Sequence, residues 1–350
     1  RELAQNMAIK ESEAHIFDIP AAKMFNTTGG RYGQGSSYFT APNPEFGAQF
    51  TYFIKEVPKT LKAERQKEEE KLFEEKQPIP QPTRDQLRAE EKEIAPYLVL
   101  TVYDGSGAAV RRLSTDVKKG INRINWDLRY HYPSPVTVDD GKFSSTSMGR
   151  AGMLAMPGNY SVAMDMVAKG EVTRLAGPES FTAEPLNLAT MPDNNPEMMA
   201  QFREQVTELS RIFMGMDQKV SEEMNRVVSL KQAALRTPAA ALSLQSRITK
   251  VEDELKELHF IMHGPPAVAS WEELPPMEMP LSRRLNVAVR NHWSNSAGLS
   301  KIVTDQYEIL KEELSPLVDR LNALDAEIEA IETALESAGA GWTPGRKIEL

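Results

Sequence analysis

The stretch Gly120-Ile121-Asn122-Arg123-Ile124-Asn125-Trp126-Asp127-Leu128-Arg129 decides the fold class of this chain. Its apolar residues Ile124, Trp126 and Leu128 alternate with polar ones, and successive side chains of a β-strand point to opposite faces. The pattern therefore predicts a half-buried strand of an antiparallel sheet, running from Gly120 to Tyr130. Trp126 is the largest side chain on the apolar face, so we expect it in the centre of the core.

Two further runs alternate in the same way and are bounded by turn residues, which is typical of hairpins. They are Leu98, Leu100 and Val102 before Asp104-Gly105-Ser106-Gly107, and Tyr160, Val162, Met164 and Met166 after Pro157-Gly158-Asn159. An aromatic run over 48–55 and two short runs, 172–175 and 180–183, supply the remaining strands. We therefore predict a small antiparallel β-sandwich over residues 48–185.

A charged segment, residues 58–95, interrupts the strand pattern between the first and second strands. It is rich in Glu and Lys at spacings of three and four, which supports exposed helices. Thr83-Arg84-Asp85 is typical of the start of a second helix after three prolines. The segment is predicted to be a helical insertion with a solvated charged face, and a docking surface is the alternative.

The pattern changes after Pro185, where apolar residues begin to recur at steps of three and four. Asn195 before Pro196 is a typical helix start, and Gly264 and Gly339 are typical stops. Three long apolar stripes and a shorter one lie between these signals, and each must be buried against the others. Residues 195–337 are thus predicted to form an antiparallel α-helical bundle, followed by a C-terminal tail, 338–350.

Composition excludes several classes of protein and site. The 350 residues carry a formal net charge of −9, which disfavours a nucleic-acid binder because such proteins present a basic face. The chain has no cysteine, so disulfides, thiolate metal sites and cysteine nucleophiles are excluded. No apolar run approaches the length of about 20 residues that a membrane span needs.

No catalytic, cofactor-binding or metal-binding constellation accompanies these patterns. His259 and His263 are one helical turn apart with Glu254 and Glu257 nearby, but no third ligand is identifiable, so we interpret the pair as surface or packing residues. The glycines between Thr28 and Gly35 lack the spacing of a phosphate loop and are interpreted as part of a flexible linker, 26–47.

Two other candidates concern glycans and ligands. Asp127 and Asp165 fall on outward faces of predicted strands, where carboxylates are surface charge and lack the desolvated setting of a general acid. The long loop 131–156 is the best place to look for a ligand contact, since loops of this length in compact domains often carry binding functions.

The order of motifs resembles a known family. The string Ala41-Pro42-Asn43-Pro44-Glu45-Phe46-Gly47-Ala48, the Asp104 turn with Val110-Arg111-Arg112-Leu113, the Gly120–Arg129 stretch and Pro157-Gly158-Asn159-Tyr160 carry the resemblance. They are similar to the C-terminal region of bacterial sortilin-like proteins with a β-propeller of neuraminidase-type (BNR) repeats. Within that region, the middle part resembles the Ig-like module of flagellar hook-capping proteins.

The resemblance implies an α+β fold, with an Ig-like antiparallel β-sandwich followed by the helical bundle. It implies that residues 1–25 are the end of the last strand of an upstream propeller, and that the protein is exported to the periplasm or cell surface. Members are often labelled glycosyl hydrolases, but that label rests on the propeller repeats, and no family catalytic residue maps onto this sequence.

From these patterns together we expect a non-catalytic structural or interaction module that links the propeller to a helical rod. The alternative is an accessory part of a glycoside hydrolase-like enzyme whose active site lies in the propeller. Expected partners are the propeller of the same chain, another protein or a glycan, and a second copy bound through the helical bundle.

Overall fold

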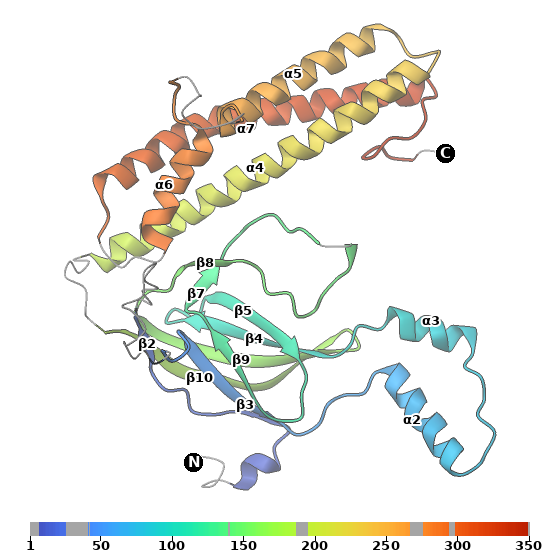
Figure 1. Cartoon of the computed structure of the whole chain (residues 1–350), viewed down its shortest axis with the longest axis vertical. Coiled ribbons are helices and arrows are strands. Elements are labelled where there is room, and N and C mark those ends of the chain that lie inside the picture. Colours follow the sequence, from blue (N-terminus) through green and yellow to red (C-terminus); the bar gives the residue numbers. More distant parts are fainter. Residues whose placement is uncertain are drawn as a thin grey trace. The chain divides into compact units, whose positions relative to one another are not determined.

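The computed structural model describes residues 7–25, 41, 43–138, 141–186, 195–266, 276–293 and 298–348, and it combines α-helices with mainly antiparallel sheets (Figure 1). The chain divides into two compact units. The first comprises Arg1–Tyr132 and Val138–Thr190, and the second comprises Pro133–Thr137 and Met191–Leu350. The described strands and the two helices between residues 58 and 95 belong to the first unit, and the helices that follow residue 195 belong to the second.

Among the described residues, the strands of the first unit form three sheets. Their order is β1-β3-β6 in one sheet, β2-β10-β9-β4-β5 in another and β7-β8 in a third. A 3₁₀ turn, Met7–Lys10, precedes them. The strands are β1 Ala14–Ile16, β2 Ala22–Met24, β3 Ala48–Ile54, β4 Tyr97–Asp104, β5 Ala109–Asp116, β6 Gly120–Trp126, β7 Arg129–His131, β8 Ala151–Leu154, β9 Gly158–Ala168 and β10 Glu171–Pro185.

One hydrophobic core is shared by the two larger sheets. Trp126 of β6 is fully buried, and its ring makes edge contacts with Tyr160 of β9 at 5.2 Å and with Phe181 of β10 at 6.0 Å between centroids. Phe50 of β3 also meets Phe181 edge-on at 5.3 Å. The alternating run of β4 places Leu98, Leu100 and Val102 in this core, with no exposed surface. The sequence prediction of Trp126 at the centre of the core is therefore confirmed.

The predicted strand from Gly120 to Tyr130 is shorter in the structure, because it ends at Trp126. Leu128 is buried but has a left-handed backbone, with φ of 53°, which breaks the extended conformation. The backbone N–H of Arg129 donates to Oδ1 of Asp127 at 3.1 Å and closes the turn. Residues after the turn belong to β7, a strand of a different sheet.

Two other boundaries differ from the sequence predictions. The short runs 172–175 and 180–183 are parts of one strand, β10, whose pairing with β9 shifts register between Arg174 and Glu179. Residues 14–24, expected to end an upstream domain, instead pair with this unit: β1 is antiparallel to β3, and β2 is parallel to β10. A short strand is stable only when it pairs with a larger sheet. Here β3 is the partner of β1, and β10 is the partner of β2. Residues 26–40 and 42 of the predicted linker lie outside the described residues.

The insertion 58–95 is helical, as predicted, and consists of α2 Leu61–Glu74 and α3 Arg84–Lys92, which lie to one side of the strands (Figure 1). Thr60 and Thr83 cap the two helices, and Thr83 forms a full capping box with Gln86. Neither helix has a buried residue. They are joined by polar contacts, chiefly the guanidinium of Arg65 on the carboxylate of Glu90 at 2.5 and 2.9 Å.

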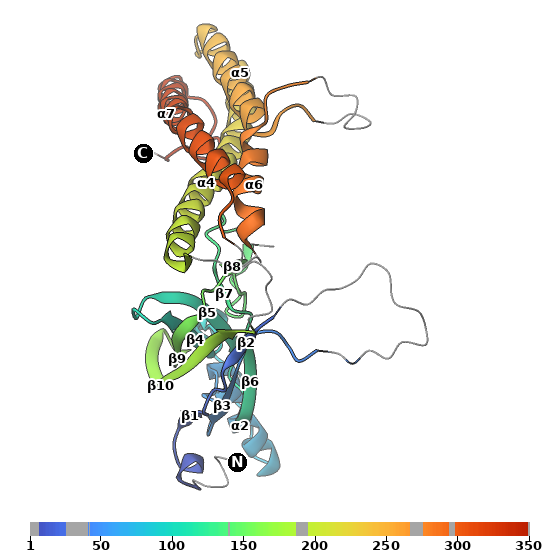
Figure 2. The ribbon, with the colours of Figure 1, turned by 90° about the vertical axis from the view of Figure 1, so that its left-hand side faces the viewer.

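The second unit contains four helices among the described residues, and α4, α5 and α7 run alongside one another (Figures 1 and 2). The apolar stripes predicted from the sequence are buried at almost every position. Asn195 caps α4, its side chain accepting from the N–H of Met198 at 3.1 Å. The helices are α4 Pro196–Arg236, α5 Ser243–His263, α6 Leu281–Trp293 and α7 Lys301–Ser337.

Ion pairs between α4 and α7 show that these two helices are parallel. Lys219 binds Asp325 at 2.8 Å, and Arg226, seven residues later, binds Glu332 at 2.8 Å, also seven residues later. Because residue numbers rise together along both helices, the two helices must be parallel. The spacing of seven is the heptad repeat, at which side chains flanking an apolar seam recur.

The ion pairs of α5 with α4 and with α7 follow the opposite order. As residue numbers rise along α5, the numbers of the partner residues fall. Helix α5 is therefore antiparallel to α4 and to α7, and the three helices run up, down and up. The pairs with α4 are Lys231–Glu252 and Asp217–His263, and those with α7 are Arg247–Glu327 and Glu254–Arg320.

At one turn of α4 the buried side chain is charged and not apolar. Met224 continues the recurrence of apolar residues at steps of three and four along α4, but it is only half-buried, whereas Glu223 is buried, with 1% of its surface exposed. The Oε1 atom of Glu223 accepts from Lys219 and Arg226, each at 2.7 Å. Two cations and the carboxylates of α7 therefore surround it, and the charges of this cluster largely cancel one another.

Replacement of Trp126 by alanine is expected to lower the free energy of unfolding of the first unit by about 3–5 kcal/mol, because it leaves a cavity against Tyr160 and Phe181. Chemical unfolding followed by circular dichroism measures the change. The control is Ile121→Ala on the same strand, where the side chain is 54% exposed and the loss should stay below about 1 kcal/mol. Equal losses in the two variants would contradict this account of the core.

The helical unit is expected to lose stability on acidification through Asp325. The hydrogen bond from Lys219 holds the pKa of Asp325 below its ordinary value, so the stabilisation is present above about pH 4 and is lost as pH falls through the lowered value. Asp325→Asn should be less stable at pH 7 by roughly 1 kcal/mol and lose less stability between pH 7 and pH 3. Glu329→Gln, which removes an exposed carboxylate from the same helix, is the matched control. An unchanged pH profile in Asp325→Asn would refute the assignment.

Candidate functional site

The loop that the sequence singled out, residues 131–156, is anchored at both ends by β7 and β8. Arg129 pairs with Leu154 and His131 with Ala151. The N–H of Ala155 donates to the carbonyl of Leu128 at 2.7 Å, immediately after the turn that ends β6. Asp139 and Asp140 lie outside the described residues, so the site is built from the residues near the two anchored ends.

Two arginines hold the returning end of this loop through backbone carbonyls. Arg111 of β5 donates from Nη1 to the carbonyl of Arg150 at 2.8 Å and from Nη2 to that of Gly149 at 3.0 Å. Arg129 donates from Nη1 to the carbonyl of Gly152 at 3.1 Å. Hydrogen bonds from a charged donor contribute about 1.5–3 kcal/mol each, so these contacts fix residues 149–152 firmly.

Gly152 is required for the close approach of the two strands. A Cβ atom at this position would lie 2.8 Å from the carbonyl oxygens of Tyr130 and His131, a distance that real Cβ atoms do not adopt. The glycine therefore allows β8 to lie against β7, and it brings residues 149 and 150 close to His131.

Several cationic residues lie along this strand pair, with Arg150 beside Tyr132 and His131 on the other face. Arg111 is only 7% exposed, and the guanidinium of Arg150 lies over the ring of Tyr132, 5.6 Å from its centroid. A Cβ atom on Gly149 would lie 3.6 Å from Cε1 of His131, so the imidazole packs beside that glycine. Partial burial of the ring, and secondarily the charge of Arg111, lower the pKa of His131 below its ordinary value.

The histidine pair on α5 lies at a different place, in the second unit. The rings of His259 and His263 are 4.8 Å apart, and Nε2 of His263 is 2.7 Å from Oδ1 of Asp217 on α4. Glu254 is engaged by Arg320 at 2.7 Å and does not join the pair. Within the described residues, no group of three or more His, Asp or Glu side chains converges as a metal site would require.

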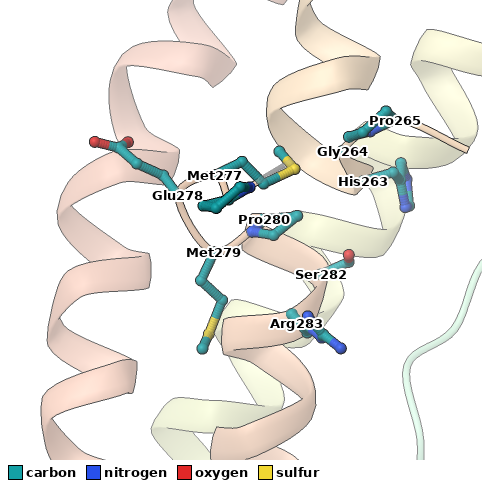
Figure 3. A pocket seen from close by; sticks show the side chains of 10 residues that line it. His263, Gly264, Pro265, Met277, Glu278, Met279, Pro280, Ser282 and Arg283 are labelled. Atoms are coloured by element: carbon teal, nitrogen blue, oxygen red, sulfur yellow. The ribbon is translucent and has the colours of Figure 1, made fainter. Parts of the chain in front are cut away.

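A pocket of about 410 Å³ lies beside His263, between the end of α5 and the start of α6 (Figure 3). Its wall consists mainly of prolines and of Met277 and Met279, and the carboxylate of Glu278 points away from the other side chains (Figure 3). Gly264 has φ of 75°, and a Cβ atom there would lie 2.9 Å from Pro280, so glycine is needed where the chain turns into this wall. The pocket offers apolar contacts and a rim that carries the imidazole of His263 and the guanidinium of Arg283.

The two aspartates considered for glycoside chemistry are not brought together. Oδ1 of Asp127 accepts from the backbone of Arg129 in the turn after β6, and Asp165 on β9 forms an ion pair with Arg174 at 2.5 Å. Each carboxylate therefore has a local partner and a structural role.

Sequence reasoning located the loop but missed the residues that make its ends distinctive. Arg111 lies in a run of two arginines, Arg111-Arg112, and only the strand alternation of β5 could have indicated which one points inward. His131 and Arg150 come from opposite ends of the loop, so their proximity depends on the pairing of β7 with β8. No signal in the sequence specifies that pairing.

Comparison of the sequence with protein-family models, with curated proteins and with solved structures finds no match. Across the described residues, no helix combines the length and apolar character needed to cross a bilayer.

Replacement of Arg111 by glutamine is expected to release the returning end of the loop, because it removes both hydrogen bonds to the carbonyls of residues 149 and 150. Backbone amides of Ala151–Leu154 should then exchange at least about tenfold faster, equivalent to about 1.4 kcal/mol of local stability. Hydrogen exchange followed by mass spectrometry measures this. Arg112→Gln removes the same charge from an exposed position and should leave exchange unchanged. Faster exchange in both variants would count against a specific role for Arg111.

Proposed function

We propose that this chain is a non-catalytic structural and interaction module of an exported multidomain protein. In this proposal the first unit is an Ig-like antiparallel β-sandwich, and the second is an antiparallel helical bundle that acts as a rod. The module links an upstream β-propeller of the sortilin-like, BNR-repeat type to that rod, outside the cytoplasm. The motifs from Ala41 to Tyr160 support the family assignment by resemblance.

The observation that carries the proposal is the construction of the second unit as a spacer. Helix α4 alone has 41 residues, and at about 1.5 Å per residue it extends for about 60 Å. Its apolar stripe is buried at almost every position by α5, α6 and α7, and ion pairs spaced by seven residues flank it. A long helix supported in this way is suited to holding attached parts at a fixed separation.

A second function is favoured by the anchored loop. In the alternative proposal the module is an accessory part of a glycoside hydrolase-like enzyme, and loop 131–156 completes an active site in the propeller. The rigid attachment of residues 149–152 by Arg111 and Arg129 supports this alternative, since a contributing loop must hold its side chains in place.

The two proposals predict different outcomes when the loop is removed from the intact protein. Residues 134–148 would be replaced by a short Gly-Ser linker, which leaves β7, β8 and the arginine contacts of residues 149–152 in place. The structural proposal predicts unchanged turnover on any glycan that the intact protein hydrolyses, and no hydrolysis by the 350 residues alone. A loss of turnover of about tenfold or more, with an unchanged circular dichroism spectrum, would favour the accessory-enzyme proposal instead.

Self-association through the helical bundle is the remaining part of the proposal. Leu242, between α4 and α5, is 87% exposed, and Leu235 and Ile302 are 71% and 68% exposed, so the bundle presents apolar side chains beyond its own seam. Sedimentation velocity at micromolar concentration should show a dimer that Leu242→Lys weakens. A monomer at every concentration would remove this part of the proposal without affecting the spacer function.

A further inference from the structure

The hairpin that α4 and α5 form has a charge opposite to that of the chain as a whole. The protein contains 50 acidic residues and has a formal net charge of −9, yet residues 224–251 include no Asp or Glu. The cationic side chains of the same stretch are Arg226, Lys231, Arg236, Arg247 and Lys250. Because salt screens charges that are more than about 8–10 Å apart, the potential at the end of this hairpin depends on these local residues and not on the net charge.

Two of these cations have no partner inside the described part of the chain. Arg236 is the last residue of α4, and Lys250 lies near the start of α5. Both side chains are exposed, and neither forms an ion pair with a carboxylate of the described residues. The other three cations do form such pairs. Helix α5 also begins without a side-chain cap and without an acidic residue in its first turn, so the positive end of its dipole adds to the local charge.

The same end of the hairpin exposes apolar side chains. Leu242, in the turn between the two helices, is 87% exposed, and Leu235, in the last turn of α4, is 71% exposed. The other exposed residues of the turn are uncharged, and they are Pro238, Ala239 and Ala241. The turn lies at the end of the antiparallel α4–α5 pair (Figure 1). A flat surface that meets this end of the bundle therefore contacts the turn before it contacts the sides of the helices.

We propose that the end of the α4–α5 hairpin is a docking site for the surface of a bilayer that contains anionic phospholipids. Leu242 and Leu235 enter the region between the head groups and the acyl chains, while Arg236 and Lys250 contact lipid phosphates. Exposed apolar side chains flanked by cations bind proteins to such surfaces without spanning them. A soluble polyanion would satisfy the cations but leave the leucines in water, so the two features together favour a bilayer. The inference goes beyond the spacer function and does not use the family resemblance.

A second copy of the chain is the competing occupant, because self-association would also bury Leu242. Two copies that meet through this end bring Arg236 and Lys250 of each close together, and like charges across a contact oppose it. Residues 224–251 contain no carboxylate that could separate these charges. When both occupants are available, the charge of the hairpin end therefore favours the bilayer.

Binding to vesicles measures the site directly. The 350-residue chain is titrated with vesicles of phosphatidylcholine and phosphatidylglycerol in equal amounts, and separately with vesicles of phosphatidylcholine alone. Cosedimentation gives the bound fraction. Binding to the mixed vesicles should be tighter by about tenfold or more, because each cation near an anionic surface contributes about a fivefold factor. The difference should shrink as sodium chloride raises the ionic strength.

Matched variants separate docking through this hairpin from general attraction. Leu242→Ser should weaken binding to mixed vesicles by about fivefold or more, because a leucine no longer leaves water. Arg236→Gln should weaken it by about fivefold, because one cation is lost. The controls are Ile302→Ser, which removes an apolar side chain that is 68% exposed at the start of α7, and Lys311→Gln, which removes an exposed cation of that helix. Each control should change the affinity by less than about twofold, since α7 is parallel to α4 and its start lies at the opposite end of the bundle.

Three results would overturn the proposal. The first is equal binding to mixed and neutral vesicles, or binding to neither. The second is unchanged binding of Leu242→Ser beside a loss in Arg236→Gln, which would indicate contact with a polyanion and no insertion. The third is a dimer that Leu242→Ser abolishes in sedimentation velocity while no vesicle binds, which would assign the hairpin end to a second copy of the chain. All four substituted positions are exposed, so unchanged circular dichroism spectra confirm that each variant is folded.

Discussion

The packing of Trp126 against Tyr160 and Phe181 determines where the first sheet ends and where the candidate site begins. The indole is fully buried between the two larger sheets, and its Nε1 donates to the carbonyl of Arg129 at 2.9 Å, beyond the turn. That bond holds the start of β7 over the end of β6. Leu128 is buried in a left-handed conformation, so the extended strand cannot continue through this residue. The direction in which the loop leaves the core is thus fixed by the core itself.

The second unit depends on a different constraint, which is that each long helix has one apolar stripe only. Such helices gain stability by facing their stripes toward each other, and the flanking positions then meet at intervals of seven residues. Charges at those positions select one alignment: a helix shifted by a turn would lose Lys219–Asp325 and Arg226–Glu332 together. Partly exposed pairs contribute little stability individually, so their main effect is on register.

The sequence predicted the elements well because their patterns are local. In α5, for example, apolar residues recur at steps of three and four from Leu244 to Met262, and all six of these positions are buried. The end of β6 was not predictable, because Leu128 fits the alternation and only the turn with Asp127 reveals the break. Glu223 was missed for a related reason: a charged residue beside a seam is normally exposed. Its burial depends on Lys219 and Arg226 of the same helix, which in turn bind carboxylates of α7. The pairing of β1 with β3 joins segments far apart in the chain, and periodicity contains no information about such pairs.

Two of the buried charged residues in the described part of the chain, Glu223 and Arg111, have different kinds of partner. Glu223 is flanked by Lys219 and Arg226, and their partners on α7 complete a cluster whose charges nearly cancel. Arg111 is buried to a similar degree, but its partners are carbonyl oxygens, which carry no net charge. A neutral donor or an apolar side chain could fill the same space without the cost of burying a cation. What the guanidinium adds is two charged hydrogen bonds from one side chain to the carbonyls of residues 149 and 150, and these hold the returning end of the loop.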